Sequence, residues 1–228
     1  MKLVYSLGGS VLWEKSPLEL KDLAQALKEV ASDHQVFVVV GGGRIAREYI
    51  EKARALGANE AFCDLMGIGA TRLNAMLLIA ALGESASPEP PATYANALEA
   101  SFGGKIVVLG GMQPGQTTDA VAALLAEYAS ASKLIVATSV DGVYTADPFK
   151  DPKAKKIERM TPAELVGLSA DTELKAGSRS PVDPLASKII ERSSIPTTVV
   201  YGGEALNLKK AVEGTHEGTE IVPRSHQM

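Results

Sequence analysis

Three glycine-rich turns contain residue types that could bind phosphate. Each turn follows a short apolar run, and the turns are Gly8-Gly9-Ser10, Gly41-Gly42-Gly43 and Gly110-Gly111. Glycine lets the backbone approach an anion closely, and free N–H groups at the start of a helix attract negative charge. One such turn is weak evidence, because strand-to-helix turns often contain glycine for steric reasons alone. Three turns at the same edge of one sheet predict a site long enough for several phosphates.

Two common phosphate-binding motifs do not account for these turns. A Walker A loop requires G-x-x-x-x-G-K-[ST], and the sequence contains no such string. Segment 41–46 fits G-x-G-x-x-A, and Asp64 lies about twenty residues further on, as a dinucleotide-binding fold requires. That match lies on the second strand and leaves the other two turns unexplained, so the dinucleotide interpretation is disfavoured.

The turns are expected at the ends of buried parallel strands. Short runs rich in Val, Ile and Leu alternate with amphipathic stretches, which is the pattern of βα repeats. Capping boxes at Ser16–Glu19 and Thr161–Glu164, and the pair Asp183-Pro184, indicate helix starts. This order predicts an α/β fold, a three-layer α/β/α sandwich around a mainly parallel sheet. The expected strands are Leu3–Leu7, Val36–Val40, Ile106–Leu109, Leu134–Ala137 and Thr197–Tyr201.

Two loop-rich segments interrupt this alternation. The first, Ser85–Pro91, contains three prolines, and the second is Asp147–Lys156. The second segment separates a larger N-terminal part from a smaller C-terminal part. A chain of 228 residues suits one large α/β domain, so we expect a single domain over residues 1–228.

Composition and charge exclude several classes of protein. Hydrophobic residues make up 46% and charged residues 22%, which is typical of a globular chain, and the net charge of −4 predicts no nucleic-acid partner. Cys63 is the single cysteine, so no intrachain disulfide can form, which favours a reducing, cytoplasmic location. No signal peptide is expected, and the longest apolar runs, such as Ala75–Leu82, are too short to span a bilayer, so we expect no membrane partner.

The histidines show no metal-ligand spacing. They are scattered along the chain and are expected at the surface, at His34, His216 and His226. We therefore expect no metal site built from protein side chains.

Longer strings resemble those of uridylate kinases in the amino-acid-kinase superfamily, and their details resemble its archaeal branch. Segment 38–47, VVVGGGRIAR, is similar to the nucleotide-phosphate loop of that family, and segment 64–75, DLMGIGATRLNA, to the next helix. Segment 110–119, GGMQPGQTTD, resembles the UMP-binding loop, and segment 138–148, TSVDGVYTADP, the ATP-side loop. The resemblance covers almost the whole chain in the family's order, so it is more specific than any single motif.

The resemblance implies an amino-acid-kinase-like fold with an acceptor-binding part at about residues 1–130 and an ATP-binding part at about 131–224. It also implies a homohexamer. The implied ATP contacts are Gly9, Ser10, Gly43, Arg47, Thr138, Tyr144 and Asp147. The implied UMP contacts are Gly42, Asp64 (on the ribose), Met112, Gln113, Pro114, Gly115, Gln116, Thr117 and Thr118. The implied catalytic residues are Asp183, Arg47, Gly9 and Ser10.

Ser6 departs from the family pattern. Many members have a lysine two residues before the first glycine pair, where it would stabilise the moving phosphoryl group, and archaeal-type uridylate kinases often lack it. Other lysines could supply the charge, although each could equally be an ordinary solvated side chain. The candidates are Lys155, Lys156 and Lys188.

Three of the implied site residues also have structural interpretations. Asp64 could cap the helix that follows it, and Asp183 could be only an N-cap before Pro184. Tyr144 could be an ordinary half-buried strand residue. These interpretations stay open at the level of sequence.

The implied reaction moves the γ-phosphoryl group of ATP to a phosphate oxygen of UMP. That oxygen is already anionic near neutral pH, so no general base is needed, and Mg²⁺ on the donor phosphates requires few protein ligands. One alternative is another superfamily kinase, acting on acetylglutamate, carbamate, aspartate or isopentenyl phosphate. The loop Gln113–Thr118 favours a nucleotide acceptor instead. The second alternative, a nucleotide-binding sensor or storage protein without turnover, is favoured only by Ser6.

Overall fold

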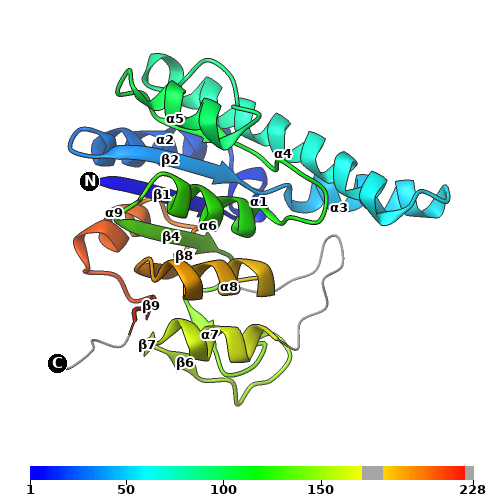
Figure 1. The fold of residues 1–228 in the computed structure, drawn as a ribbon, viewed down its shortest axis with the longest axis vertical. Coiled ribbons are helices and arrows are strands. Elements are labelled where there is room, and N and C mark those ends of the chain that lie inside the picture. Colours follow the sequence, from blue (N-terminus) through cyan, green and yellow to red (C-terminus); the bar gives the residue numbers. More distant parts are fainter. Residues whose placement is uncertain (171–181, 224–228) are drawn as a thin grey trace.

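A mainly parallel sheet lies between two layers of helices (Figure 1), and the computed structural model describes residues 1–170 and 182–223. The strand order is β3-β2-β1-β4-β8-β9-β7, in which β9 runs antiparallel to β8 and the other pairs are parallel. The predicted three-layer α/β/α sandwich is confirmed. The strands are β1 (Lys2–Leu7), β2 (Gln35–Val40), β3 (Val107–Leu109), β4 (Lys133–Thr138), β7 (Arg159–Met160), β8 (Thr197–Tyr201) and β9 (Thr219–Ile221).

Each of the five predicted strands is present, within one or two residues of its expected bounds. The sequence did not indicate β7 or β9, nor the small antiparallel pair β5 (Val143–Tyr144) and β6 (Lys156–Ile157). These strands are two or three residues long, so their pairing partners rather than their own sequences determine them.

Helices cover both faces of the sheet because successive strand residues point to opposite sides. In β1, Val4 packs into one apolar cluster, whereas Leu3, Tyr5 and Leu7 pack into the other. The first cluster is completed by α5 (Tyr94–Ser101), α6 (Thr118–Tyr128), α7 (Pro162–Ser169) and α8 (Pro184–Ser193). The second is completed by α1 (Gly9–Trp13), α2 (Pro17–Ala31), α4 (Glu60–Leu82) and α9 (Leu206–Glu213).

The predicted helix starts are also present. Ser16 and Thr161 form full capping boxes with Glu19 and Glu164, and Asp183 caps α8. Asp64 does not cap a helix, which contradicts that interpretation, because α4 begins four residues earlier with Asn59 as its N-cap. The proline-rich segment after the short 3₁₀ turn at Gly83–Ser85 is irregular apart from one bridge between Ala86 and Ile106.

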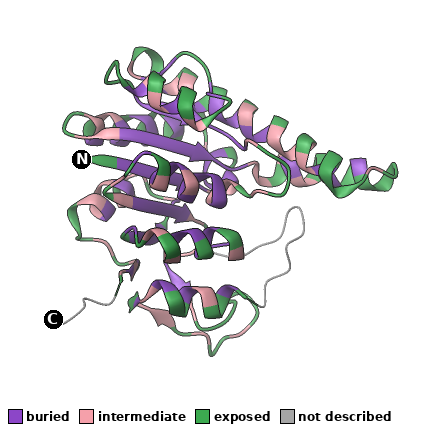
Figure 2. Ribbon diagram, viewed as in Figure 1, coloured by how far each residue is buried: buried purple, intermediate pink, exposed green. Residues whose placement is uncertain are grey.

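Helices α3 (Gly43–Ala55) and α4 pack against each other and project together beyond the sheet (Figure 1). Segment Glu60–Ser85 is long and apolar enough, by length and composition, to cross a bilayer, with a mean hydropathy of 1.6 and 33% of its most apolar window buried. The expectation that no apolar stretch is long enough was therefore wrong. The physical reason is that α4 has exposed as well as buried positions (Figure 2), and several of the exposed ones are apolar too, such as Leu65, Leu73 and Met76.

Candidate active site

The first two glycine turns touch each other backbone to backbone. A Cβ on Gly9 would lie 1.9 Å from the Gly43 nitrogen, and a Cβ on Gly41 would lie 2.6 Å from the Gly9 nitrogen. Gly43 also has φ of +62°, a conformation that side chains disfavour. The two turns therefore form one continuous backbone surface at the carboxyl ends of β1 and β2. Ser10 lies half-buried in the first turn of α1, next to this surface.

A second group of contacts lies around Ser6 in β1. Ser6 is 1% exposed, and its hydroxyl donates to Asp119 Oδ1 at 2.6 Å. Asp183 Oδ1 accepts from the backbone N–H of Leu185 and Ala186, while its other oxygen accepts from the Thr117 hydroxyl. Asp183 is thus an N-cap and a partner of the third glycine loop at the same time.

Asp183 lies close enough to Asp119 for its charge to raise the energy of the charged form of Asp119. Burial and, to a smaller extent, the charge of Asp183 raise the pKa of Asp119 to about 7, and the hydrogen bond from Ser6 partly opposes both effects. Because the ionised form of this carboxyl group is destabilised, the group readily binds a proton or is stabilised by a cation placed beside it. Many members of the resembled family have a lysine at the position of Ser6. In this chain that position holds a serine beside the Asp119 carboxyl group, whose pKa is raised.

The third glycine loop is fixed to α4. Thr71 Oγ1 accepts from the Gly111 N–H at 2.7 Å, and Asp64 Oδ2 accepts from the Gly115 N–H at 2.7 Å. Gly115 has φ of +80°, which explains glycine at that position. The nearby Gln116 Oε1 is buried and has no hydrogen-bond partner in the part of the chain that the structure describes. An unpaired buried acceptor of this kind points to a ligand that donates to it.

The remaining members of this loop, Met112, Gln113, Pro114 and Thr118, lie between β3 and the first turn of α6. Gly42 lies beside the same part of α4, since a Cβ there would lie 3.4 Å from the Thr71 methyl group. Asn74 strengthens this connection by donating to the Gly41 carbonyl at 2.8 Å. Each predicted UMP-contact residue thus lies in or beside one stretch of backbone attached to α4.

The segment after β4 has its own hydrogen-bond network. Tyr144 donates to Asp141 at 2.6 Å, and Lys156 donates both to Asp141 and to the Glu217 carbonyl, each at 2.9 Å. Burial raises the pKa of Asp141, but the hydrogen bonds from Tyr144 and Lys156 outweigh it and leave the pKa below its usual range. Asp147 accepts from the Phe149 N–H and pairs with Lys150.

These contacts stay within the segment and its neighbours, so they do not join Tyr144 or Asp147 directly to the glycine turns. Thr138, at the end of β4, lies closer to them: its Cα would be 3.7 Å from a Cβ on Gly8. Tyr144 is half-buried in β5, as its structural interpretation stated.

The candidate cations differ in their surroundings. Lys188 is 62% exposed and pairs with Glu191 at 3.1 Å on the outside of α8, which agrees with a solvated lysine. Lys155 is exposed. Lys156 is engaged by Asp141 and is not a solvated side chain. Arg47 lies half-buried in α3, four residues after Gly43, whereas Arg44 is exposed and pairs with Glu48.

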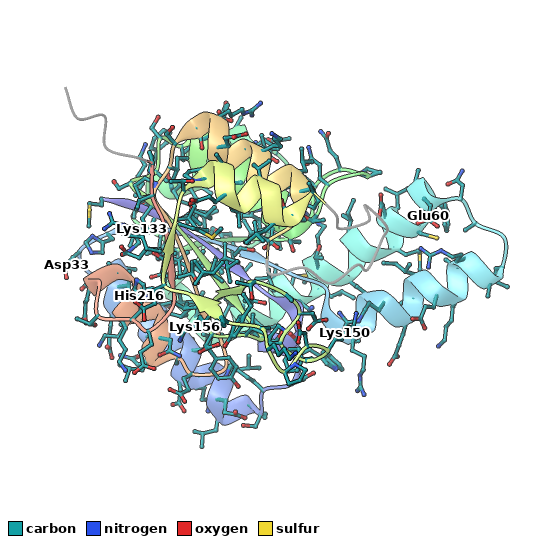
Figure 3. All side chains as sticks on the ribbon, turned by 90° about the horizontal axis from the view of Figure 1, so that it is seen from below. Asp33, Glu60, Lys133, Lys150, Lys156 and His216 are labelled. Atoms are coloured by element: carbon teal, nitrogen blue, oxygen red, sulfur yellow. The ribbon has the colours of Figure 1, made fainter. Side chains whose placement is uncertain are left out.

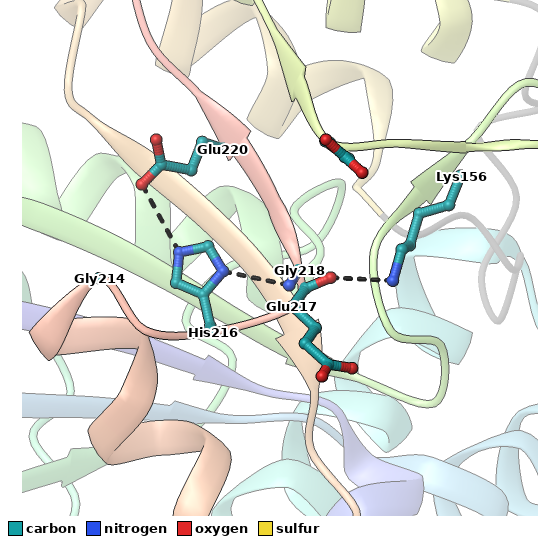
Figure 4. Close-up of a pocket in the computed structure, with 7 residues that line it drawn as sticks. Lys156, Gly214, His216, Glu217, Gly218 and Glu220 are labelled. Atoms are coloured by element: carbon teal, nitrogen blue, oxygen red, sulfur yellow. Dashed lines mark hydrogen bonds and ion pairs between the residues drawn. The ribbon is translucent and has the colours of Figure 1, made fainter.

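A hollow of about 490 Å³ lies beside Lys156 and is lined by His216, Glu217 and Glu220 (Figures 3 and 4). The His216 side chain is only 5% exposed, so the expectation of a surface histidine was wrong at this position. Its Nδ1 accepts from the Gly218 N–H at 3.1 Å, and its Nε2 lies 3.5 Å from Glu220. Burial and the charge of Lys133 lower the pKa of His216, which favours the neutral ring.

His34 is partly exposed, and His226 lies outside the described residues. Within residues 1–170 and 182–223, no three His, Cys, Asp or Glu side chains gather as they would around a metal ion.

A model of the amino acid kinase family matches residues 1–201. The chain belongs to the amino acid kinase family. Uridylate kinase of Methanothrix thermoacetophila is 61% identical to it, over 97% of this chain and 99% of the relative. Uridylate kinase of Methanococcoides burtonii is 57% identical, over 97% and 100%. The crystal structure of uridylate kinase from Archaeoglobus fulgidus matches with a TM-score of 0.89 at 51% identity, covering 97% of this chain and 100% of that one.

The amino acid kinase match includes every predicted site residue from Gly9 to Asp183, whereas β9 lies beyond it and the hollow around His216 lies partly beyond it. Sequence reasoning missed Asp119, which touches Ser6 and lies next to Asp183. A signal for it was available, since an aspartate in the first turn of a helix after a glycine loop lies at the ligand edge of a parallel sheet. Thr71 and Asp141 were also missed, because only the folded chain brings them to their partners.

Proposed function

We propose that this chain transfers the γ-phosphoryl group of ATP to UMP, giving UDP and ADP. The observation that supports this most strongly is the full-length similarity to proteins named uridylate kinase, at up to 61% identity, together with the joined glycine turns. The unpaired Gln116 oxygen in the third loop supports a nucleotide acceptor, because a base or ribose offers donors that could satisfy it.

Catalysis in this proposal consists of positioning two anions and neutralising charge. The N–H groups of Gly9, Ser10 and Gly43, together with Arg47, hold the donor phosphates, and the segment with Thr138, Tyr144 and Asp147 holds the adenosine half. The acceptor lies on the loop Met112–Thr118 with Gly42, and Asp64 contacts its ribose. The acceptor phosphate is its own nucleophile, so no side chain removes a proton.

Asp183 organises the reacting centre through its second carboxylate oxygen. Its cap bonds to α8 fix its position, and the Thr117 hydroxyl connects it to the acceptor loop. Asp119, beside it, makes this region receptive to positive charge. Mg²⁺ bound to the donor phosphates would supply such charge and needs few protein ligands, which fits a chain whose described residues offer no three-ligand cluster.

The proposal extends to organisation and location. An acceptor-binding part at about residues 1–130 and an ATP-binding part at about 131–224 agree with the attachment of the acceptor loop to α4. We also propose a homohexamer and a cytoplasmic location without nucleic-acid or membrane partners. The single buried Cys63 and the net charge of −4 support the location and the absence of a nucleic-acid partner.

ADP release with a panel of acceptors tests the reaction. We expect UMP to be preferred to CMP, and AMP and GMP to be very poor acceptors, because a loop built around hydrogen bonds rejects a base that leaves its groups unpaired. The measurement is kcat/KM for each nucleotide at saturating ATP and Mg²⁺. Equal values for UMP and GMP would reject the assignment of the acceptor, and no ADP release with any acceptor would reject a kinase.

A further inference from the structure

Two buried polar side chains on α4 hold two different glycine turns. Thr71 is 6% exposed and Asn74 is 3% exposed, and they lie three residues apart, so they share one side of the helix. Asn74 Nδ2 donates to the carbonyls of Gly41 and Gly42, at 2.8 and 3.3 Å. Thr71 Oγ1 accepts from the Gly111 N–H at 2.7 Å. One short stretch of helix therefore contacts both the second and the third glycine turn.

The helix itself does not require these two residues. Asparagine and threonine form helices less readily than alanine or leucine, and a buried polar group costs stability unless it is hydrogen-bonded. The Thr71 hydroxyl donates to the Ile68 carbonyl at 2.6 Å, which leaves its lone pairs free for the Gly111 N–H. The third turn is also in close contact with this hydroxyl, because a Cβ on Gly110 would lie 2.6 Å from Thr71 Oγ1. The hydrogen bonds of both side chains are thus directed at the turns.

The second and third turns have no direct backbone link. The register of β2 with β3 ends at Val39 and Leu109, before either turn begins. Among the described residues, no backbone hydrogen bond joins segment 41–43 to segment 110–111. The Thr71 methyl group also lies beside the second turn, where a Cβ on Gly42 would be 3.4 Å away. Beyond the ends of the strands, side chains of α4 therefore set how the two turns lie relative to each other.

We propose that Thr71 and Asn74 are positioning residues that fix the separation of the donor and acceptor phosphates. The inference rests on the function proposed above, in which Gly43 lies at the donor phosphates and the loop that follows Gly111 holds the acceptor. Both side chains act through the backbone of the turns and not by touching a substrate. Phosphoryl transfer requires the reacting groups close together and in line, and a misplacement of about 1 Å can cost on the order of 10²-fold in rate.

This role has a kinetic signature of its own. Each substrate is bound by its own loop, so loss of one α4 contact should leave both KM values nearly unchanged. The separation of the loops matters when both substrates align for transfer, so the loss should appear in kcat. A side chain that serves stability alone would lower the melting temperature and leave the kcat of the folded molecules unchanged.

Substitutions at Thr71 separate its hydroxyl from the rest of the side chain. Thr71→Val keeps the shape and the methyl group beside Gly42 but leaves the Gly111 N–H without its acceptor. Thr71→Ser keeps the hydroxyl and loses the methyl group. At the other turn, Asn74→Leu removes the donor to the Gly41 carbonyl, and it decides the question if Thr71→Val does not fold.

Ser101→Ala is the matched control. Ser101 is 8% exposed on α5, and its hydroxyl donates to the Leu98 carbonyl three residues back, as the Thr71 hydroxyl does on α4. In the part of the chain that the structure describes, this hydroxyl contacts none of the three glycine turns. The control therefore removes a buried helix hydroxyl without releasing a loop.

Steady-state kinetics tests the proposal with the nucleotide that the wild type phosphorylates fastest. We expect kcat to fall about tenfold or more in Thr71→Val and in Asn74→Leu, with both KM values within about threefold of wild type. Thr71→Ser and Ser101→Ala should keep kcat within about threefold of wild type. Circular dichroism checks that each variant is folded. Calorimetric titration with the same nucleotide counts binding sites per chain, and a wild-type count excludes inactive protein as the cause of a lower kcat.

A wild-type kcat in folded Thr71→Val or folded Asn74→Leu would overturn the proposal, as would a Thr71→Ser variant as slow as Thr71→Val. Loss of folding in both Thr71→Val and Asn74→Leu would assign the pair to stability and overturn it as well. Failure of the proposed function shows instead in the wild type, as no ADP release with any acceptor, and that result would reject both proposals.

Discussion

At the scale of single residues, the two oxygens of Asp183 have different partners. One accepts from two backbone N–H groups of α8, and the other accepts from the Thr117 hydroxyl. Asparagine is as good an N-cap as aspartate, so a change of this residue to asparagine separates its charge from its structural role. Asp183 is therefore both a helix cap and a charged partner of the Thr117 loop, and the two roles can be measured separately.

Asp183→Asn is expected to lower kcat by about tenfold or more while the melting temperature and UMP affinity stay nearly unchanged. The cap survives the substitution, whereas the negative charge that we propose to lie beside the transferring phosphoryl group is lost. Steady-state kinetics and calorimetry measure the two effects on the same preparation. An unchanged kcat would reduce Asp183 to a helix cap.

At the scale of elements, the segment between β4 and β6 is held by a connected set of side-chain hydrogen bonds. Lys156 in β6 reaches Asp141 in the loop after β4, and Asp141 in turn holds Tyr144 in β5. Lys156 also reaches the Glu217 carbonyl, just before β9. The position of the proposed adenosine contacts therefore depends on a lysine that touches none of the glycine turns.

Lys156→Met should raise the KM for ATP by about threefold or more and leave the KM for UMP unchanged, because only the ATP-side segment loses its anchor. Lys155→Met is the matched control, since Lys155 is the neighbouring exposed lysine. Both KM values are measured with the other substrate saturating. Equal effects of the two variants, or a rise confined to UMP, would contradict this account.

The elements that could be predicted from the sequence are those that nearby residues determine. The buried strands at Leu3–Leu7 and Val36–Val40 and the capping boxes were found because hydrophobic runs and caps are local signals. Strands β5, β6, β7 and β9 were missed because two or three residues hold too little pattern. Within the site, the glycine turns were predicted to lie together, and they do.

The contacts that were missed are non-local. Asp119 meets Ser6 across 113 residues, and Thr71 meets Gly111 across 40 residues. No spacing rule links such positions, since the sheet order rather than the distance along the chain decides which residues meet. The interpretation of Asp64 as a helix cap was wrong for a different reason: the helix begins before it, where the Asn59 side chain accepts from the Phe62 N–H.

At the scale of the whole molecule, the Asp119 carboxyl links folding to pH. Its pKa is about 7 in the folded chain against an ordinary value of 3.8 for aspartate, so the folded state binds more protons between these limits. Stability in the absence of nucleotide therefore falls as the pH rises from about 4 to about 7, and the full cost is present above pH 7. A cation such as Mg²⁺ bound nearby would act against this cost, because opposite charge favours the ionised carboxylate.

Asp119→Asn should remove this dependence because asparagine cannot ionise. The melting temperature of the variant relative to wild type is expected to be higher at pH 8 than at pH 5, measured by calorimetry without ligands. Asparagine still accepts the Ser6 hydroxyl, so the comparison isolates the charge. If the melting temperatures of variant and wild type differ by the same amount at both pH values, Asp119 does not titrate in this range.

The position of β1 in the sheet has a consequence for synthesis on the ribosome. β1 pairs with β2, which follows closely, but its other edge pairs with β4, whose residue Lys133 lies 130 positions after its partner Leu3. At roughly 5–20 residues per second, this edge stays open for on the order of ten seconds or more after β1 emerges. The nascent chain thus exposes a largely apolar strand with one unpaired edge that is open to wrong partners, and chaperones that bind early intermediates would find a target there.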